Sequence, residues 1–506
     1  MPSLSPFDPS DLTAEFLLSL QKQLKAQEDT QRIKELTQYR DFYEGGLATS
    51  QDKYVKKHFR EEEDAYIQRV SRMTTANICK PVVRAITTAM YGKDPTRHVA
   101  KRSSRKRREF SEDKRLQEII TNAQYGNIIK QATRRASIFG TDIVGPWFNP
   151  KRRRVEFRTR NIESVYPISD DTNGQDLIGL YLENIHTDRD TGEQYLRVEF
   201  WSDDSYGIWR NLRLGDQAFY PDPEAGYDYP NPGPNPYGLI PWATFRAEPD
   251  LDEGTWWGLS DIRDVSEINL HINELLSILD MNIHDQGWSQ LVLKGYPDNV
   301  DALNIGRLKA ISIPSGYESG GGAEYIVPNL LVESVMLFID RLHRLATEGA
   351  NVPLGAIRTY GEAKSGVSIE LEIKPLLDMA GDRQERYCWV EGDLLKLALI
   401  VDDVHTKKRV FSVDQAREFT ETWEATVEWP NDMRPTDIEK EIARDQTLFE
   451  MKIVDPLRLT EKYNALNGQT AESRHAEIAE RYNKMEPDDP APIPAVRTAP
   501  GGPKKE

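Results

Sequence analysis

The apolar positions along this chain follow two different periods, and the changes between them divide the sequence into segments. Over residues 11–42, 74–91 and roughly 116–129, apolar side chains recur every three or four positions, which predicts helices. From Gly140 to about Phe245 the spacing falls to two, and turn sequences such as Asp-Thr-Gly separate the runs. This alternation predicts an antiparallel β-region.

The most regular helical pattern follows that β-region. From Leu259 to Ile283 an apolar residue falls at every third or fourth position, and Ser260 is placed to cap the first turn. Residues 288–328 then contain short β-like runs between turns. A second helix is predicted over about 331–348. Two helices therefore flank a small β-module.

The C-terminal part of the chain also begins with a helical pattern. A long helix is predicted over 365–405, and it must bend at Pro375 because the proline ring and its missing N–H interrupt the hydrogen-bond ladder. A strand is expected near 425–430 and charged helices over 437–484. The tail 485–506 holds six prolines and is expected to be disordered. Together these elements predict the α+β class.

Composition narrows the class of protein. Asp and Glu number 82 against 65 Lys and Arg, and the net charge of −17 argues against a histone-like coat for nucleic acid. The two cysteines cannot build a disulfide framework or a four-thiolate zinc site. No apolar run is long enough to span a membrane, and the first residues lack the pattern of a signal peptide. We therefore expect a soluble protein made inside a cell, with no membrane partner.

The motifs of common enzyme classes are missing. The sequence has no G-x-x-x-x-G-K-[ST] phosphate loop, no H-E-x-x-H metal helix and no G-x-S-x-G nucleophile elbow. It therefore nominates no catalytic residue, no metal ligand and no cofactor. Two basic clusters, at 101–108 and 151–160, are either solvated faces or patches for nucleic acid or an acidic partner.

Three segments, taken in order, carry a resemblance to a known family. They are NPYGLIPWATF (235–245), WGLSDIRDVSEINLHINELLS (257–277) and SGVSIELE (365–372). Their order and spacing resemble those of portal proteins of the siphophage type, the ring-shaped head-to-tail connectors of tailed double-stranded DNA bacteriophages. Single positions that match the family pattern are Tyr39, Tyr43, Gly45, Asn77, Tyr237, Gly238, Ile240, Pro241, Phe245, Gly258, Ser260, Asp261, Asn273 and Ser277. Ser368 departs from it, because alanine is frequent there.

The resemblance implies the portal fold, with a mixed α/β wing, a helical stem, a small β-containing clip, a kinked tunnel helix and a helical C-terminal crown. Mapped onto this sequence, its parts are a partly disordered N-terminal arm at 1–29, the wing at 30–253, a stem helix at 254–287, the clip at 288–328, a second stem helix at 329–350, the tunnel loop at 351–364, the kinked tunnel helix and wing return at 365–436, the crown at 437–484 and a disordered proline-rich tail at 485–506.

The resemblance also implies a function without catalysis. Such chains form a ring, usually of twelve copies, at one capsid vertex, through which genomic DNA is packaged and later ejected. The implied partners are double-stranded DNA, the terminase large subunit, the major capsid protein, the scaffolding protein and a head-completion or adaptor protein. The protein would be made in the host cytoplasm and end in the virion, at the head–tail junction. The two basic clusters would lie on the wing and serve assembly or packaged DNA.

Site residues are expected in three of these parts. In the tunnel loop Arg358, Tyr360 and Lys364 would face DNA, unless the loop is an ordinary surface loop. In the clip Lys294, Arg307 and Lys309 would contact DNA, the motor or the adaptor, unless they are simply solvated. The stem stripe would be core, a seam between subunits, or both, and its members are Leu259, Ile262, Ile268, Ile272, Leu275 and Leu279.

The charge of the first stem helix suits a conduit for DNA. A helix over 256–286 is about 45 Å long, and on the order of 27 DNA phosphates would lie beside it. Between residues 260 and 286 the sequence has six carboxylates and one arginine. Such a helix would repel DNA mildly and would not trap it, although an ordinary solvated helix has the same pattern.

Two other functions stay open on the sequence. The basic clusters could form the DNA face of a cytosolic DNA-processing enzyme, which predicts metal-dependent activity. A non-viral oligomeric scaffold would bind only proteins. Imaging for a ring with an open axial hole separates that scaffold from a portal protein.

Overall fold

The structure is a computed structural model of the 506-residue chain. It describes residues 12–27, 30–45, 51–59, 61–71, 73–102, 111–170, 173–188, 191–216, 218–223, 229–250, 255–286, 290–294, 304–305, 308–309, 311–313, 322–326, 332–353 and 366–429. The chain divides into two compact units, Met1–Met433 and Arg434–Glu506, and all described residues lie in the first. The predicted crown and proline-rich tail lie outside the described residues.

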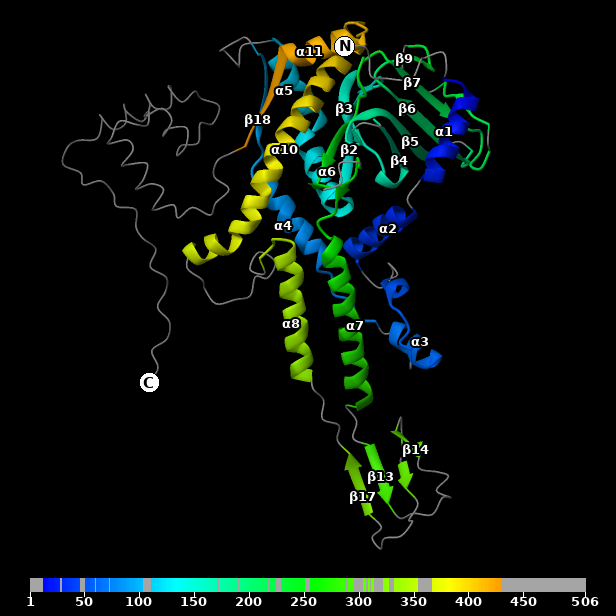
Figure 1. The fold of residues 1–506 in the computed structure, drawn as a ribbon, viewed down its shortest axis with the longest axis vertical. Helices are drawn as coiled ribbons and strands as arrows, with labels where there is room; N and C mark the ends of the chain where they lie inside the picture. The colour runs from blue at the N-terminus through cyan, green and yellow to red at the C-terminus, as the bar shows by residue number, and fades with distance from the viewer. Residues whose placement is uncertain are drawn as a thin grey trace, which may run out of the picture. The chain divides into compact units, whose positions relative to one another are not determined.

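The N-terminal part of this unit is mainly helical (Figure 1). Its elements are α1 (Ala14–Gln27), α2 (Thr30–Glu44), the 3₁₀ turn η3 (Gln51–Tyr54), α3 (Glu63–Ser71), α4 (Cys79–Tyr91), α5 (Ser111–Ala123) and α6 (Tyr125–Phe139). The helical periods of the sequence are therefore confirmed in this part of the chain.

Two helix boundaries differ from the sequence prediction. The pattern at about 116–129 predicted one helix, but Gln124 adopts a left-handed backbone with φ 51° and separates α5 from α6. The pattern at 74–91 predicted a helix from residue 74, but α4 begins at Cys79. Residues 73–78 are not helical because alternate N–H groups in this segment bond to side chains of another helix, as described below.

The β-region predicted from Gly140 to Phe245 is confirmed. Its strands are β2 (Thr141–Asn149), β3 (Arg154–Thr159), β4 (Val165–Ser169), β5 (Leu177–Thr187), β6 (Gln194–Trp201), β7 (Ser205–Arg210), β8 (Tyr220–Pro221), β9 (Gly233–Pro234) and β10 (Ala243–Arg246), with the 3₁₀ turn η4 (Ile162–Ser164) before β4. All their pairings are antiparallel. One sheet has the order β10-β2-β3 and the other β4-β5-β6-β7-β8, with β9 paired to β7.

A two-stranded pairing joins distant parts of the chain. β1 (Thr96–Lys101) pairs antiparallel with β18 (Trp423–Glu428). The strand expected near 425–430 is β18. Its partner could not be chosen from local sequence, because a two-stranded pair is specified by what packs on it.

Long helices follow the β-region and the short strands β11 (Glu248–Pro249) and β12 (Gly258–Leu259). α7 (Arg263–Gln286) and α8 (Val332–Gly349) lie side by side (Figure 1). α10 (Gly366–Thr406) is one helix across Pro375, and Figure 1 shows its first turns at an angle to the rest, as the proline predicts. α11 (Val413–Thr422) begins with a capping box formed by Ser412 and Gln415.

Between α7 and α8 the chain forms short strands, as predicted for 288–328. β13 (Gln290–Lys294) pairs antiparallel with β17 (Gly322–Ile326) and parallel with β16 (Ile311–Ile313). β14 (Asn304–Ile305) pairs with β15 (Leu308–Lys309). The fold of the described chain is therefore mixed α+β.

Two buried clusters hold the unit together. The larger one includes side chains of α4, α6, α10 and the sheet of β2, β3 and β10. The apolar stretch Leu394–Val401 of α10 lies in this core and is almost wholly buried, apart from Lys396. The smaller cluster packs Leu17 and Leu20 of α1 against Tyr181 and Phe200 of the larger sheet. No helix in the described part combines the length and apolar character that crossing a bilayer requires.

Candidate functional site

The residues predicted to face DNA are only partly within the described chain. Arg358, Tyr360, Lys364 and Arg307 lie outside the described residues. Lys294 ends β13 and Lys309 ends β15, and only their backbone positions are described. Contacts of these residues with DNA, motor or adaptor stay predictions.

The predicted stem stripe lies along α7, with Leu259 just before it on β12. Ile262 and Ile272 are fully buried and Leu279 nearly so, while Ile268 and Leu275 are partly buried against the larger core. Within a single chain this stripe already serves as core. Its part in a contact between subunits stays a prediction.

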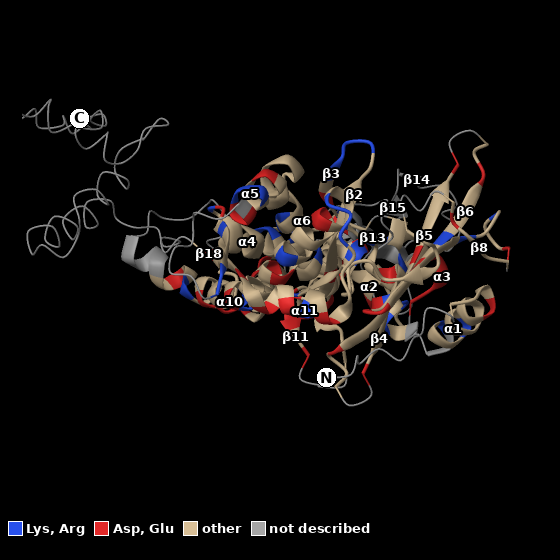
Figure 2. Ribbon diagram, turned by 90° about the horizontal axis from the view of Figure 1, so that it is seen from above, with Lys and Arg blue, Asp and Glu red and all other residues tan. Residues whose placement is uncertain are grey.

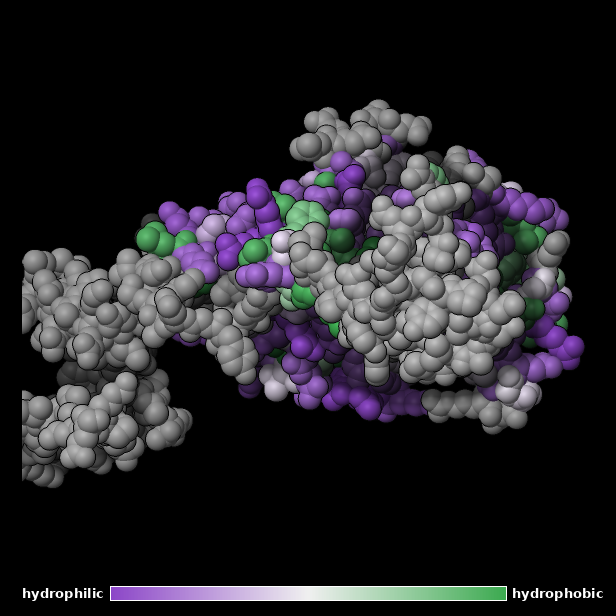
Figure 3. All heavy atoms as spheres, turned by 90° about the horizontal axis from the view of Figure 1, so that it is seen from below, coloured by the Kyte–Doolittle hydropathy of each residue, from purple (hydrophilic) through white to green (hydrophobic). Residues whose placement is uncertain are grey.

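A second set of apolar side chains is exposed on the same two helices. Its members are between 42% and 66% exposed, and they are Ile278 and Ile283 of α7 and Met336, Leu337, Phe338 and Leu345 of α8. Sequence reasoning missed the α8 members, although five consecutive apolar residues at 335–339 must occupy every side of a helix. Elsewhere the described surface seen from below is mainly hydrophilic (Figure 3).

A ladder of side chains on α7 holds the segment 73–78, which lies outside any helix or strand. The rungs are Ile78 N–H to Asn269 Oδ1, Ala76 N–H to Asn273 Oδ1 and Thr74 N–H to Ser277 Oγ, at 2.7, 2.7 and 3.0 Å. Asn269 also donates from Nδ2 to the Ala76 carbonyl at 2.8 Å. All three α7 side chains are buried.

The ladder forms because the spacing of every fourth residue on a helix is close to the spacing of every second residue on an extended chain. Residues four apart on a helix are separated by about 6 Å along its axis, and every second residue of an extended chain by about 6.6 Å. Each N–H on this side of the segment thereby gains a partner, which a buried donor requires. The ladder ties the start of α4 to α7, and two of its rungs are positions of the family pattern.

The ladder predicts a pattern of amide hydrogen exchange. The N–H groups of Thr74, Ala76 and Ile78 should exchange more slowly than those of Thr75 and Asn77, because only the first three donate to α7. Asn273→Ala should lower the unfolding free energy by about 1–3 kcal/mol, since it leaves a donor unpaired. It should also speed exchange at residue 76.

Asn127 of α6 is exposed, so Asn127→Ala is the matched control. It should change neither the unfolding free energy nor the exchange rate at residue 76. Equal exchange rates across residues 74–78 would contradict the ladder.

Other positions of the family pattern meet in structural joints. Asn77 donates to the Tyr43 carbonyl at 3.1 Å, and any side chain at Gly45, whose φ is +67°, would collide with Asn77. The Tyr237 hydroxyl lies 3.0 Å from His405 Nε2. The residues that carry the resemblance thus hold segments of the fold together.

A buried ion pair connects α10 to the residues just before α7. Arg383 donates to both carboxylate oxygens of Asp261, at 2.7 and 2.8 Å, and to Ser137 Oγ at 3.2 Å. Both charged side chains are almost fully buried. Burial by itself would lower the pKa of Arg383, but Asp261 raises it above its ordinary value, so Arg383 stays charged. Ser260 extends the joint by donating to the Ile138 carbonyl at 2.6 Å.

A second buried charge connects α10 to β1 and α4. Glu391 accepts hydrogen bonds from Arg97 Nε at 2.8 Å and from the Tyr91 hydroxyl at 2.9 Å. Burial raises the pKa of Tyr91 well above its ordinary value, and the Glu391 charge raises it further. The Tyr91 hydroxyl therefore stays a donor at physiological pH. α10 is fixed at two points by charges that have partners on other elements.

The sequence of the chain matches one protein family over most of its length. The family model described as phage portal protein, SPP1 Gp6-like, matches residues 22–479. The chain belongs to this portal protein family. No curated protein sequence matches it. The resemblance seen in the motifs is therefore confirmed over most of the chain.

Portal proteins are structural components of bacteriophages and not enzymes; they serve genome packaging and connect the head to the tail. Family membership thus supports a ring-shaped assembly at a capsid vertex, with capsid and terminase partners in general. The described residues of this portal protein hold no group of three or more His, Cys, Asp or Glu that could bind a metal ion.

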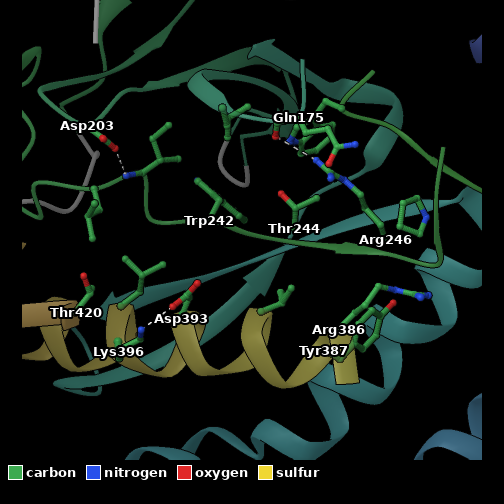
Figure 4. Close-up of a pocket in the computed structure, with 17 residues that line it drawn as sticks. Gln175, Asp203, Trp242, Thr244, Arg246, Arg386, Tyr387, Asp393, Lys396 and Thr420 are labelled. Atoms are coloured by element: carbon green, nitrogen blue, oxygen red, sulfur yellow. Dashed lines mark hydrogen bonds and ion pairs between the residues drawn. The ribbon is translucent and has the colours of Figure 1, made fainter. Parts of the chain in front are cut away.

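A cavity of about 650 Å³ lies between α10 and the sheet edge at β10 of the portal protein (Figure 4). Trp242 and Arg246 line it from the sheet, and Asp393 and Lys396 line it from α10. Asp393 and Lys396 pair with each other at 2.7 Å, and Arg246 donates to a backbone carbonyl at 3.4 Å. The residues that line it in the described part of the chain include no histidine, cysteine or serine.

Asp142 is the buried carboxyl of the portal protein with the weakest compensation among those described above. It lies on β2, wholly buried, with Arg135 Nη2 at 3.1 Å. Burial raises the pKa of Asp142 to about 7, against the lowering effect of Arg135. Ionisation of Asp142 therefore destabilises the folded state.

The contribution of Asp142 to stability should fall as the pH rises from about 4 to about 7, because in that window the unfolded carboxyl, with its ordinary pKa of 3.8, has lost a proton that the folded one keeps. Asp142→Asn should remove this dependence and raise the unfolding free energy above pH 7 by at most roughly 4 kcal/mol. Denaturant titrations at pH 5 and pH 8 measure it. The exposed Asp216→Asn is the control, and equal pH slopes in the two variants would argue against this account.

Proposed function

We propose that this portal protein forms a closed ring of identical subunits, twelve in the usual case, around an axial channel at one capsid vertex. Double-stranded genomic DNA would enter through this channel during packaging and leave through it at ejection. The observation that carries the proposal is the set of exposed apolar side chains on α7 and α8. Several large apolar side chains are thus exposed on two helices that pack against each other, and the same helices of neighbouring subunits would cover them.

The elements suggest the parts of the ring. α7 and α8 would form the stem, and the strands β13 to β17 the clip, where the terminase large subunit docks first and the adaptor later. Residues 351–364 would form the tunnel loop, and α10 the kinked tunnel helix. The wing at 30–253 would face the major capsid protein and the scaffolding protein, and residues 437–484 would form the crown.

The charge on α7 supports a channel that does not trap DNA. Asp264, Glu267 and Asp280 are exposed, and Arg263 is the one exposed cation on the described face of that helix. A protein that makes even six to ten phosphate contacts holds DNA strongly at low salt. A mostly acidic stem with few cations would let the duplex slide.

Negative-stain imaging of the purified full-length chain tests the ring. We expect annular particles with an open axial hole. Particles without a hole, or monomers at all concentrations, would overturn the proposal.

Charge reversal in the tunnel loop tests the channel. Arg358→Glu or Lys364→Glu should leave the ring intact and reduce the rate or length of DNA packaging. The loss should grow at low salt, where screening of the new repulsion is weakest. Lys22→Glu, at an exposed position on α1, is the control and should package normally. Normal packaging by both loop variants would refute a role of the loop in DNA contact.

A further inference from the structure

Two surfaces of opposite charge lie apart from each other on the unit Met1–Met433. One is the basic turn, residues 151–153 between β2 and β3, which projects as a blue loop from one side of Figure 2. The other is the acidic face of α11, formed by Asp414, Glu418 and Glu421. In the same view this helix lies away from the blue loop, near the middle of the unit, where much of the ribbon is red (Figure 2).

The basic turn has a defined backbone, and two of its three cations, Lys151 and Arg153, have no acidic partner within the described chain. Asn149 Oδ1 accepts from the N–H groups of Lys151 and Arg152 at 3.1 and 3.2 Å, which fixes the turn. Arg152 pairs with Glu156 at 3.0 Å. Among the residues that the structure describes, no carboxylate lies within 4.0 Å of Lys151 or Arg153. All three basic side chains are exposed.

The carboxylates of the acidic face of α11 form no ion pair within the described chain, because Arg417 of the same helix pairs with Asp203 at 3.4 Å. Its three residues are four and three positions apart, so they share one side of the helix. All three are exposed, whereas Ala416 on the opposite side is buried. No Lys or Arg nitrogen of the described chain lies within 4.0 Å of these carboxylates. Like charges at this spacing destabilise an isolated helix. A basic partner would reduce the repulsion between these carboxylates.

A ring brings opposite sides of identical subunits together. Each subunit presents one side to the neighbour ahead and the other side to the neighbour behind, so a contact between unlike surfaces repeats around the ring. The net charge of −17 makes two copies repel each other at long range. A cationic turn that meets an acidic helix counters this repulsion where the subunits touch and selects their orientation.

We propose that the basic turn of one subunit docks on the acidic face of α11 of the next subunit. This inference rests on the proposed ring and names the contact that orients its wings. The partner is therefore a second copy of this chain.

Two charge-reversed variants of the full-length chain test the contact. The basic-turn variant carries Lys151→Glu and Arg153→Glu, and the acidic-face variant carries Glu418→Lys and Glu421→Lys. In each variant alone, like charges meet at every interface. Ring yield at low salt should therefore fall about tenfold, from the lost attraction and added repulsion of two exposed pairs. At high salt the ring yield of each variant should come closer to that of the unmodified chain, because salt screens both the attraction that is lost and the repulsion that is added.

Mixing the two variants gives the decisive result. Opposite charges meet again only when the variants alternate, so an equimolar mixture should regain rings, and native mass spectrometry should find the variants in a ratio of 1:1. Lys22→Glu with Arg213→Glu changes the net charge by the same amount as the basic-turn variant, at exposed positions away from both surfaces, and this control should assemble normally. Thermal unfolding of each variant verifies that its fold is intact.

Three results would overturn the inference while the ring itself stands. These are normal assembly of either variant alone, a mixture that regains nothing, and loss of DNA binding by the basic-turn variant with normal assembly. That last result would assign the turn to DNA. If the unmodified chain forms no ring, the proposed function fails first, and the inference falls with it.

Discussion

Arg383→Met should lower the free energy of unfolding by roughly 3–5 kcal/mol, because it leaves the Asp261 carboxylate buried without its partner. Arg383 is 2% exposed and Asp261 6% exposed, and their two hydrogen bonds are 2.7 and 2.8 Å long. Water cannot replace the guanidinium at such a site. Denaturant unfolding at constant pH measures the loss.

The double variant Arg383→Met with Asp261→Leu separates the charge from the packing. It removes both charges and should recover most of the lost stability, because a buried ion pair is often replaceable by apolar side chains of similar volume. Arg213→Met, which breaks an exposed pair with Glu193, should cost less than about 1 kcal/mol. If the double variant is as unstable as Arg383→Met, the unpaired charge is not the cause.

Leu337→Asp combined with Leu345→Asp should abolish the ring and leave the single chain folded. Leu337 is 66% exposed and Leu345 50% exposed in the chain by itself, so aspartate at these positions stays hydrated in a monomer. In a seam between stems the same carboxylates would be buried without partners, which is strongly unfavourable. Analytical ultracentrifugation should find monomers, and thermal unfolding should be close to that of the unmodified chain.

Ile272→Asp is the informative contrast to that variant. Ile272 is fully buried in the core of its own chain, so a charge there should unfold the monomer and should not merely dissociate the ring. Leu275→Asp, at a partly buried position of the predicted stripe, should give monomers or aggregates. Normal rings from the double aspartate variant of α8 would place the seam elsewhere.

Local periodicity predicted much of this fold. The helical spacing from Leu259 to Ile283 corresponds to α7, and the alternation after Gly140 corresponds to antiparallel strands. Pro375 indicated the bend in α10. These predictions succeed because the periods of helix and strand, and the missing N–H of proline, are properties of neighbouring residues.

The candidate site was less accessible to the same reasoning. The stem stripe was identified, but sequence alone could not tell a core position from a seam, since both are apolar. The structure identifies the core positions: Ile262 and Ile272 are buried in the single chain, whereas Leu337 and Phe338 are exposed in it. Asn273 and Ser277 matched a family pattern, yet their use as acceptors for another segment depends on where residues 73–78 lie.

The sequence by itself determined the α+β class, the succession of helices and strands, and the ordered motifs by which the family was recognised. Only the tertiary structure decided that residues 73–78 bond to α7 and not within a helix of their own, that β1 pairs with β18, and that Arg383 meets Asp261. The physical reason is the distance along the sequence over which each interaction acts. Periodicity and capping act over a few residues, whereas a buried N–H or charge takes whichever partner the packed chain brings to it.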